Sequence, residues 1–319
     1  MKNIKNSLLI VLPMILLISS TACSPAVATP LATSAPAARP LPSPSPAPTM
    51  QPGDTTRELT INDTNRKYYL HIPPGLAQDQ PVPVVLIFHE FTYPVSQTRA
   101  QTHLDEIADK NSFITVYPVG TGTSWNAGTC CGTAVQDQVD EIAFVRQILT
   151  DLGSVVKVDS KRIYATGFSN GAMLAYRLAC EMSDTFAAVA PVEGDLVSNP
   201  CQPQQPVSIL HVHGLNDPYV PFEGGSSSPD CGSGCPATFP PVKQGLDTWA
   251  QLNGCTGTPQ SQVDGAITHI TYPCPAGTAI ELYTLDGMEH AWPQPSGSGK
   301  FNFPASQTIW DFFAAHPKS

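Results

Sequence analysis

Charged residues are scarce in this sequence, and basic residues are the scarcest of them. Only 13% of the 319 residues are Asp, Glu, Lys or Arg, and 16 Lys and Arg face 26 Asp and Glu, which gives a formal net charge of −10. A chain with so few cations and no basic stripe is a poor candidate for binding nucleic acid or an anionic membrane surface. Hydrophobic residues make up 41% of the chain, so it can bury a core of one large or two modest domains.

The sequence also lacks the C-x2-C spacing that is typical of zinc and redox sites, although it contains nine cysteines. So many thiols without a metal motif are unusual in a reduced cytosolic enzyme and favour an exported protein with disulfides. We therefore expect no metal ion and no other cofactor.

The apolar run nearest the start of the chain is too short to cross a bilayer as a helix. Leu8–Ile18 spans about eleven residues behind Lys2 and Lys5, which is typical of a signal peptide. Residues 1–22 are therefore predicted to be a signal peptide. Thr21-Ala22-Cys23 resembles a bacterial lipobox, which makes Cys23 the predicted lipidation site and a lipid anchor the only expected contact with a membrane. An alternative cleavage site after residues 26–28 would release a soluble protein.

Prolines are concentrated in the next segment, because residues 24–56 hold nine of the 33 in the chain. Such a segment buries too little apolar surface to offset the entropy of ordering it. We predict that residues 23–56 form the lipobox cysteine and a disordered linker, and that residues 57–319 form a single folded domain.

Strand and helix patterns alternate along that domain. The segments typical of strands are Arg57–Ile61, Lys67–Ile72, Val82–Phe88, Phe113–Tyr117, Arg162–Thr166, Ala187–Val192, Val207–His213 and Ala279–Leu285. Helical spacing of apolar residues covers Leu104–Ile107, Glu141–Leu149, Gly171–Glu181 and Ala305–His316. This alternation predicts an α/β fold with a mostly parallel central sheet and helices on both faces.

A candidate nucleophile lies at one strand-to-helix junction. Gly167-Phe168-Ser169-Asn170-Gly171 is a G-x-S-x-G motif between a predicted strand and a predicted helix. In this setting glycines permit a sharp turn that exposes the serine. The backbone N–H of Asn170 would then point from the helix start towards a developing oxyanion. A glycine-rich turn with a spectator serine is the alternative reading.

A nucleophilic serine needs a base and an acid that orients it, in the chain order Ser, Asp or Glu, His. Asp217 and His290 each follow a predicted strand, at the sheet edge where open α/β folds place their sites. The competing acids are Asp195, Asp230 and Asp286, of which Asp195 is the strongest. His211 and His213 are expected to be structural hydrogen-bonding residues of a buried strand rather than bases or metal ligands.

Longer blocks around these residues resemble the secreted esterase/polyhydroxybutyrate depolymerase family. The blocks that carry the resemblance are Ser124–Gly128, Cys130–Gly132, Val139-Asp140, Arg162–Met173, Ala175–Glu181, His213–Asp217 and His290–Pro293. The resemblance covers roughly residues 57–315 and implies serine esterases of the α/β-hydrolase fold. That family includes feruloyl esterases, acetylxylan esterases and polyester depolymerases.

Carried over by position, the resemblance implies Ser169 as nucleophile, Asp217 as acid and His290 as base. It also implies that Trp125 and Trp292 line the substrate pocket, with ordinary packing as the alternative role of both.

The sequence departs from the family pattern after the third predicted strand, where Glu90 stands at a position usually held by glycine. The next residue, Phe91, is expected to supply the second oxyanion N–H. A left-handed backbone at Glu90 would be strained, and its carboxylate would oppose an oxyanion unless it points to solvent or is paired.

The cysteines are expected to add a disulfide scaffold to this fold. Two pairs are suggested by their short separation, namely Cys231–Cys235 and Cys255–Cys274. Adjacent cysteines rarely bond each other, so Cys130 and Cys131 are each expected to reach a different partner among the rest. One of these bonds could tie the Trp125 loop to the helix behind Ser169.

Three functions fit these observations. The first is an esterase that removes feruloyl or acetyl groups from plant cell-wall polysaccharide, so that its substrate is an ester-bearing polysaccharide or a hydroxycinnamate ester. The second is a depolymerase of polyhydroxybutyrate or a related polyester. The third is a surface-binding protein on a hydrolase scaffold that Glu90 has impaired. The insertion at Gly224–Pro241 could form a lid, which suits a discrete aryl ester.

Overall fold

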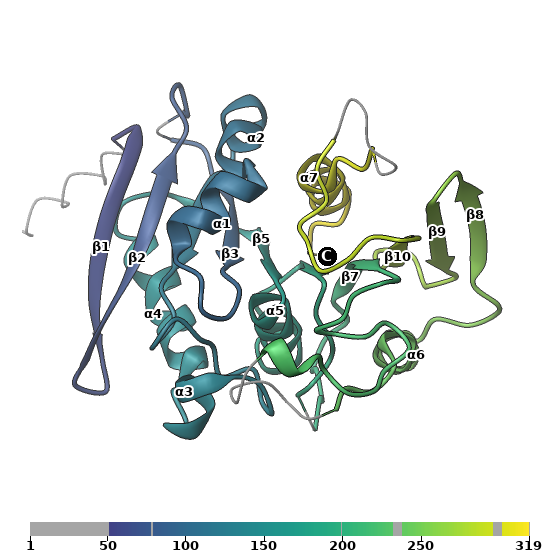
Figure 1. The fold of residues 1–319 in the computed structure, drawn as a ribbon. Coiled ribbons are helices and arrows are strands. Elements are labelled where there is room, and N and C mark those ends of the chain that lie inside the picture. Colours follow the sequence, from purple (N-terminus) through teal and green to yellow (C-terminus); the bar gives the residue numbers. More distant parts are fainter. Residues whose placement is uncertain (1–50, 78, 199, 232–237, 296–301, 319) are drawn as a thin grey trace, which may run out of the picture. The chain divides into compact units, whose positions relative to one another are not determined.

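The computed structural model describes residues 51–319, apart from 78, 199, 232–237, 296–301 and 319 (Figure 1). The predicted signal peptide, Cys23 and most of the predicted linker lie outside these residues. The boundary predicted after residue 56 needs a correction, because the first strand already begins at Gly53. Residues 53–56 pair with the following strand, with Gly53 opposite Ile72 and Thr56 opposite Tyr69.

The described residues form a ten-stranded sheet. Its strands are β1 (Gly53–Ile61), β2 (Thr64–Ile72), β3 (Val82–Phe88), β4 (Ile114–Pro118), β5 (Val158–Phe168), β6 (Ala188–Val192), β7 (Ser208–Gly214), β8 (Gln260–Asp264), β9 (Ile267–Tyr272) and β10 (Ile280–Leu285). Their order across the sheet is β1-β2-β4-β3-β5-β6-β7-β10-β9-β8. The strands from β4 to β10 in this order are parallel, and antiparallel strands flank them on both sides. The predicted, mostly parallel α/β sheet is therefore confirmed.

Burial explains why the central strands were recognisable. Every residue of β3, β4, β6 and β7 is buried, as expected where helices cover both faces of a parallel sheet. For this reason a strand such as Val82–Phe88 is a continuous apolar run and does not alternate between apolar and polar residues.

Helices cover both faces of this sheet (Figure 1). They are α1 (Val95–Thr102), α2 (Leu104–Asn111), α3 (Gly132–Gln136), α4 (Glu141–Leu152), α5 (Asn170–Glu181), α6 (Val242–Leu252) and α7 (Ala305–Ala315), with a 3-10 turn at Pro229–Cys231. One core contains Phe144 of α4, Leu174 of α5 and Trp249 of α6. The other contains Leu104 of α2 and Ile309 of α7. Among the described helices, none is both long and apolar enough to cross a membrane.

The disulfides differ in part from the expected pairing. Cys255 and Cys274 are bonded as predicted. Cys180 at the end of α5 pairs with Cys201. Cys130 and Cys131 are bonded to each other, across a cis peptide bond. The expectation that each reaches a different partner was therefore wrong, because Cys180 and Cys201 satisfy one another.

Of the other predicted pair, Cys231–Cys235, only the first cysteine is among the described residues. Cys231 is disulfide-bonded, whereas Cys235 lies outside the described residues.

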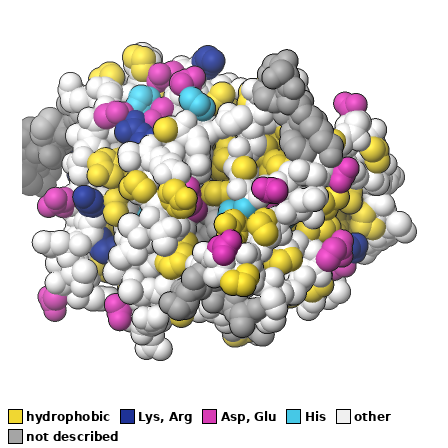
Figure 2. Space-filling model, viewed as in Figure 1, with side chains coloured by type: hydrophobic (Ala, Val, Ile, Leu, Met, Phe, Trp, Pro, Cys, Tyr) yellow, Lys and Arg dark blue, Asp and Glu magenta, His cyan; other side chains and the backbone are white. Residues whose placement is uncertain are grey.

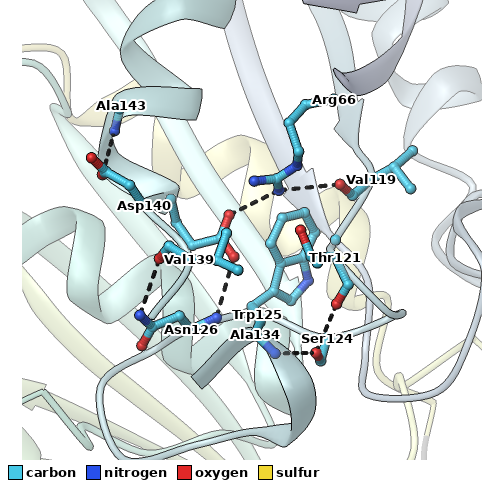
Figure 3. A network of polar contacts seen from close by, with 12 residues as sticks. Arg66, Val119, Thr121, Ser124, Trp125, Asn126, Ala134, Val139, Asp140 and Ala143 are labelled. Atoms are coloured by element: carbon cyan, nitrogen blue, oxygen red, sulfur yellow. Dashed lines mark hydrogen bonds and ion pairs between the residues drawn. The ribbon is translucent and has the colours of Figure 1, made fainter. Parts of the chain in front are cut away.

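A buried ion pair holds the segment between β4 and α4 against β2 (Figure 3). Arg66 Nη2 donates to Glu141 Oε2 at 2.9 Å and to the Val119 carbonyl at 3.3 Å. Glu141 Oε1 accepts the backbone N–H of Asn126 at 3.3 Å, and the Asn126 side chain donates to the Val139 carbonyl at 3.0 Å. The side chains of Arg66 and Glu141 are 5% and 0% exposed, so this pair fixes the loop on both sides of Trp125 from within the core.

We predict that Arg66→Met lowers the free energy of unfolding by about 3–5 kcal/mol, because it leaves the Glu141 carboxylate buried without its partner. The double variant Arg66→Met/Glu141→Leu should recover most of that loss. Urea unfolding followed by circular dichroism measures both. As a control, Lys243→Met removes an exposed ion pair with Asp247 and should cost at most about 1 kcal/mol. Equal losses for Arg66→Met and Lys243→Met would contradict the prediction.

Candidate active site

Ser169 lies at a sharp turn between β5 and α5. Its backbone has φ 54° and ψ −118°, a conformation that L-residues other than glycine rarely adopt and that concentrates at functional sites. A side chain at Gly167 would bring its Cβ to 2.5 Å from the carbonyl carbon of Gly171, and one at Gly171 would collide with the Phe88 carbonyl. Both glycines of the motif are therefore required by close backbone approach, and the spectator-serine reading does not account for this strain.

Asp217 and His290 are joined by a hydrogen bond. His290 Nδ1 donates to Asp217 Oδ2 at 2.6 Å, and Asp217 Oδ1 accepts the backbone N–H groups of Tyr219 and Val220 at 2.8 and 2.9 Å. Burial by itself raises the pKa of Asp217, but the hydrogen bond from His290, the neighbouring Glu193 side chain and the imidazoles of His290 and His213 outweigh it and lower the pKa to about 2. Asp217 is thus an anion at neutral pH, and His290 Nε2 is the ring nitrogen left for another partner.

One cavity of about 490 Å³ brings Ser169 and His290 together. Aromatic side chains form much of its wall, namely Phe91, Tyr93, Phe168, Tyr219 and Trp292. The polar part of the wall is formed by Glu90, Thr92, Gln97, Gln101 and Asp230. Figure 2 shows hydrophobic side chains near the centre of the face in view, next to a histidine and with acidic side chains close by.

Trp292 and Phe91 line this cavity. The phenyl ring of Phe168 packs on the His290 ring, with centroids 4.7 Å apart, and the Trp292 indole donates to Ser306 Oγ at 3.1 Å. The His290 ring is therefore held between the Phe168 ring and its hydrogen bond to Asp217.

Trp125 does not line the cavity, which corrects its predicted role. Its side chain is fully buried, and its indole donates to the His89 carbonyl at 2.8 Å. Asn170 binds the Trp125 backbone on both sides, because Oδ1 accepts its N–H at 2.7 Å and Nδ2 donates to its carbonyl at 3.1 Å. The Asn170 side chain thus makes the connection that a disulfide was expected to make.

The fold accommodates Glu90 without a strained backbone. Its backbone is not left-handed; the positive φ of this loop, 68°, falls on Thr92. The residue is 4% exposed, and its carboxyl group accepts hydrogen bonds from Thr98 Oγ1 at 3.1 Å and Gln101 Nε2 at 3.4 Å. Burial raises the pKa of Glu90, and these hydrogen bonds oppose the rise only in part.

The competing acids are placed elsewhere or serve other contacts. Asp195 is buried and accepts the backbone N–H of Leu196 at 2.7 Å, and burial raises its pKa to about 7. Asp230 lines the cavity, and Asp286 is exposed. Asp217 is the acid that contacts His290.

The expected lid segment, Gly224–Pro241, reaches the cavity through Asp230 and Cys231. Its residues 232–237 lie outside the described part of the chain.

Glu193, which was not predicted from the sequence, is fully buried directly after β6 and next to Asp217. No local motif marks it, and only the pairing of β6 with β7 brings it to the site. A larger cavity of about 730 Å³, lined by Tyr69, Val95 and Arg99 among others, contains none of the predicted site residues.

Several known proteins are similar to this chain in sequence. Residues 66–214 match the family described as esterase PHB depolymerase. The chain is 31% identical to feruloyl esterase B of Piromyces equi over 256 residues, which cover 77% of this chain and 44% of the relative. It is 31% identical to a probable feruloyl esterase C of Aspergillus clavatus over 216 residues, 66% of this chain and 67% of the relative. The chain spans 66% and 34% of the length of two further relatives.

Among solved structures, the fold is similar to that of an acetyl xylan esterase from Aspergillus awamori. The TM-score is 0.55 at 16% identity, and the match covers 82% of this chain and 99% of the other. At that identity the similarity supports the fold.

The buried carboxyl of Glu90 gives a prediction for stability. Because its pKa in the folded state is raised, Glu90 stabilises the fold at low pH, and that contribution is lost as pH rises through the raised pKa. The stability of Glu90→Gln minus that of the wild type should therefore increase between about pH 4 and pH 8, as measured by urea unfolding at each pH. Glu289→Gln, at an exposed position beside His290, is the matched control. A difference for Glu90→Gln that stays constant with pH would contradict the prediction.

Proposed function

The chain belongs to the esterase PHB depolymerase family, and from this premise we propose that it is an extracellular serine carboxylic ester hydrolase. Its proposed substrates are feruloyl and acetyl esters of plant cell-wall polysaccharide. The observation that carries the proposal is the cavity that contains both Ser169 and His290, with His290 held by Asp217 at 2.6 Å.

In the proposed mechanism, His290 Nε2 takes the proton of Ser169 as its oxygen attacks the ester carbonyl. Asp217 holds the ring in the tautomer with a proton on Nδ1 and stabilises the imidazolium that forms. The imidazolium then protonates the leaving alcohol, and water repeats the sequence on the acyl-enzyme. A carboxylate with a pKa of about 2 remains charged throughout the pH range in which His290 can act as a base.

The tetrahedral intermediate carries a negative oxygen that needs hydrogen-bond donors. The Asn170 N–H is suited to this task because Asn170 is the first residue of α5, where N–H groups have no acceptor inside the helix. The Phe91 N–H is the proposed second donor, since Phe91 lines the same cavity. Glu90 is compatible with both, because its carboxyl is held by Thr98 and Gln101.

The wall of the cavity favours an aromatic acyl group. Five aromatic side chains line a space of about 490 Å³, far more than an acetyl group fills, and aromatic rings stack well on one another. The polar groups of Glu90, Gln97 and Gln101 can accept or donate hydrogen bonds to the hydroxyl of a hydroxycinnamate. We therefore place feruloyl esters ahead of acetyl esters.

Polyester hydrolysis is the second candidate. Two exposed apolar side chains favour it, since Tyr93 at the cavity is 43% exposed and Leu215, two residues before Asp217, is 41% exposed. A hydrophobic polymer surface could bind against such groups.

Export is part of the proposal. The disulfides Cys180–Cys201 and Cys255–Cys274 support an oxidising compartment, in agreement with the leader predicted in residues 1–22. Attachment by a lipid on Cys23 is proposed from the lipobox-like sequence.

The test is hydrolysis by the wild type and by Ser169→Ala of methyl ferulate, acetylated xylan and emulsified polyhydroxybutyrate. We predict release of ferulate with the highest kcat/KM, and a loss of about 10⁴- to 10⁶-fold in Ser169→Ala, because the nucleophile is removed. Ser261→Ala, at an exposed position of β8, is the matched control and should retain activity.

Clearing of the polyester alone would support the second candidate. No hydrolysis of any ester would favour a non-catalytic binding protein, and activity that survives in Ser169→Ala would contradict the proposed mechanism.

A further inference from the structure

We propose that Glu193 is a positioning residue for the reaction, a neutral carboxylic acid whose O–H donates to the carboxylate of Asp217. The inference rests on the proposed function, because it assigns Asp217 as the acid that orients His290. It concerns a residue that no motif of the sequence indicates.

The fold places the two carboxyl groups side by side. Glu193 directly follows β6, Asp217 lies in the loop after β7, and these strands are parallel neighbours. The backbone N–H of Glu193 donates to the Val212 carbonyl of β7 at 2.9 Å. Glu193 has φ 51°, a left-handed conformation that costs free energy in a residue other than glycine. The structure therefore holds this side chain in place against a local preference.

The contacts of the Glu193 carboxyl are uneven. Oε1 accepts the backbone N–H of Gly214 at 2.7 Å. Oε2 is fully buried and accepts no hydrogen bond within the described residues. One ligating atom each of Glu193, His213 and Asp217 lies within 4.8 Å of the others. The bare oxygen thus sits beside the Asp217 carboxylate.

His213 does not supply the missing donor. Its Nε2 lies 3.4 Å from Glu193 Oε2 and 3.5 Å from Asp217 Oδ2, but it donates to the Val220 carbonyl at 2.8 Å. That proton on Nε2 leaves Nδ1 as an acceptor, which takes a hydrogen bond from His211 Nε2 at 2.9 Å. His211 Nδ1 in turn accepts from the Tyr176 hydroxyl at 2.8 Å. The relay of Tyr176, His211 and His213 is therefore satisfied with both imidazoles neutral.

The same relay excludes a metal ion held by Glu193, His213 and Asp217. A metal ligand must present a free lone pair, and His213 Nε2 carries a proton instead. Burial lowers the pKa of His213 to about 4 and also lowers the pKa of His211 well below its usual value, so neither ring supplies a positive charge to this cluster.

Two buried carboxyl groups so close together cannot both be ionised without a cation between them. Asp217 is the better anion, because it accepts two backbone N–H groups and the His290 ring. Glu193 accepts one backbone N–H through Oε1, and its Oε2 accepts no hydrogen bond within the described residues. Burial and the nearby Asp217 raise the pKa of Glu193 well above its usual value, whereas the pKa of Asp217 is lowered to about 2. The shared proton therefore resides on Glu193 Oε2.

A neutral Glu193 has a clear consequence for His290. Its O–H holds the Asp217 carboxylate in place beside its hydrogen bond to His290, and the cluster carries one negative charge, on Asp217. An ionised Glu193 would add a second charge and stabilise the imidazolium form of His290 further.

The experiment compares Glu193→Ala and Glu193→Gln with the wild type. Loss of a hydrogen bond to a charged group predicts a fall of about 10- to 100-fold in kcat for Glu193→Ala. The amide of Glu193→Gln can donate to Asp217 as the neutral acid does, so it should restore most of that loss. The acid limb of its kcat/KM profile should coincide with that of the wild type. Glu58→Gln, at an exposed position of β1, controls for a change of side-chain type alone.

Two results would overturn the inference. One is a Glu193→Gln variant as impaired as Glu193→Ala. The other is an acid limb displaced to lower pH in Glu193→Gln, because removal of a real negative charge would make His290 easier to deprotonate.

A second readout separates this inference from the proposed function. The ring protons of His290 can be followed by NMR against pH without any substrate, in the wild type and in Glu193→Gln. Coincident titrations support a neutral Glu193 even if no ester is hydrolysed, and a displacement to lower pH in the variant overturns it. If Glu193→Ala does not fold, as judged by circular dichroism, the Glu193→Gln comparison decides alone.

Discussion

The close approach of the Ser169 turn to the end of β3 is the constraint on which the site depends. A Cβ at Gly171 would collide with the Phe88 carbonyl, and one at Gly167 would meet Gly171. The turn can therefore pass beside β3 only with glycine at both positions, and Ser169 is left at φ 54°. Ser169, directly before α5, and the loop that begins at Glu90 then border one cavity.

A second layer of polar contacts supports this turn from inside the core. Asn170 binds the Trp125 backbone on both sides, and the Arg66–Glu141 pair anchors the same loop from β2. Asp217 is likewise anchored by two backbone N–H groups behind its contact with His290. Buried polar groups of this kind cost free energy when they are left unpaired. Loss of any of these contacts should therefore destabilise the fold as well as the site.

The sequence predicted those parts of the molecule whose signal is local. The central strands such as β3 are buried throughout and carry continuous apolar runs. The Ser169, Asp217 and His290 segments each follow a strand that the sequence predicts, so the fold class and the shared sheet edge could be inferred. The hairpin of β8 and β9 was missed because Gln260–Asp264 is entirely exposed and shows no apolar alternation. Helix α1 was missed for a similar reason, since it buries only Val95, Thr98 and Thr102.

The errors at the site concern contacts between distant segments. Trp125 was expected in the pocket, but whether an aromatic residue faces a cavity or the core depends on its neighbours in space. The position of Glu193 likewise follows from the pairing of β6 with β7, which neither spacing nor composition encodes.

The central claim is that Ser169 is a nucleophile activated by His290, and covalent trapping tests it most directly. The purified protein would be incubated with a p-nitrophenyl phosphonate, which transfers its phosphonyl group to an activated serine, and the adduct located by peptide mass spectrometry. The account predicts a single stoichiometric adduct on Ser169 that forms much more slowly in Asp217→Asn. No adduct, or an adduct on a different serine, would contradict it.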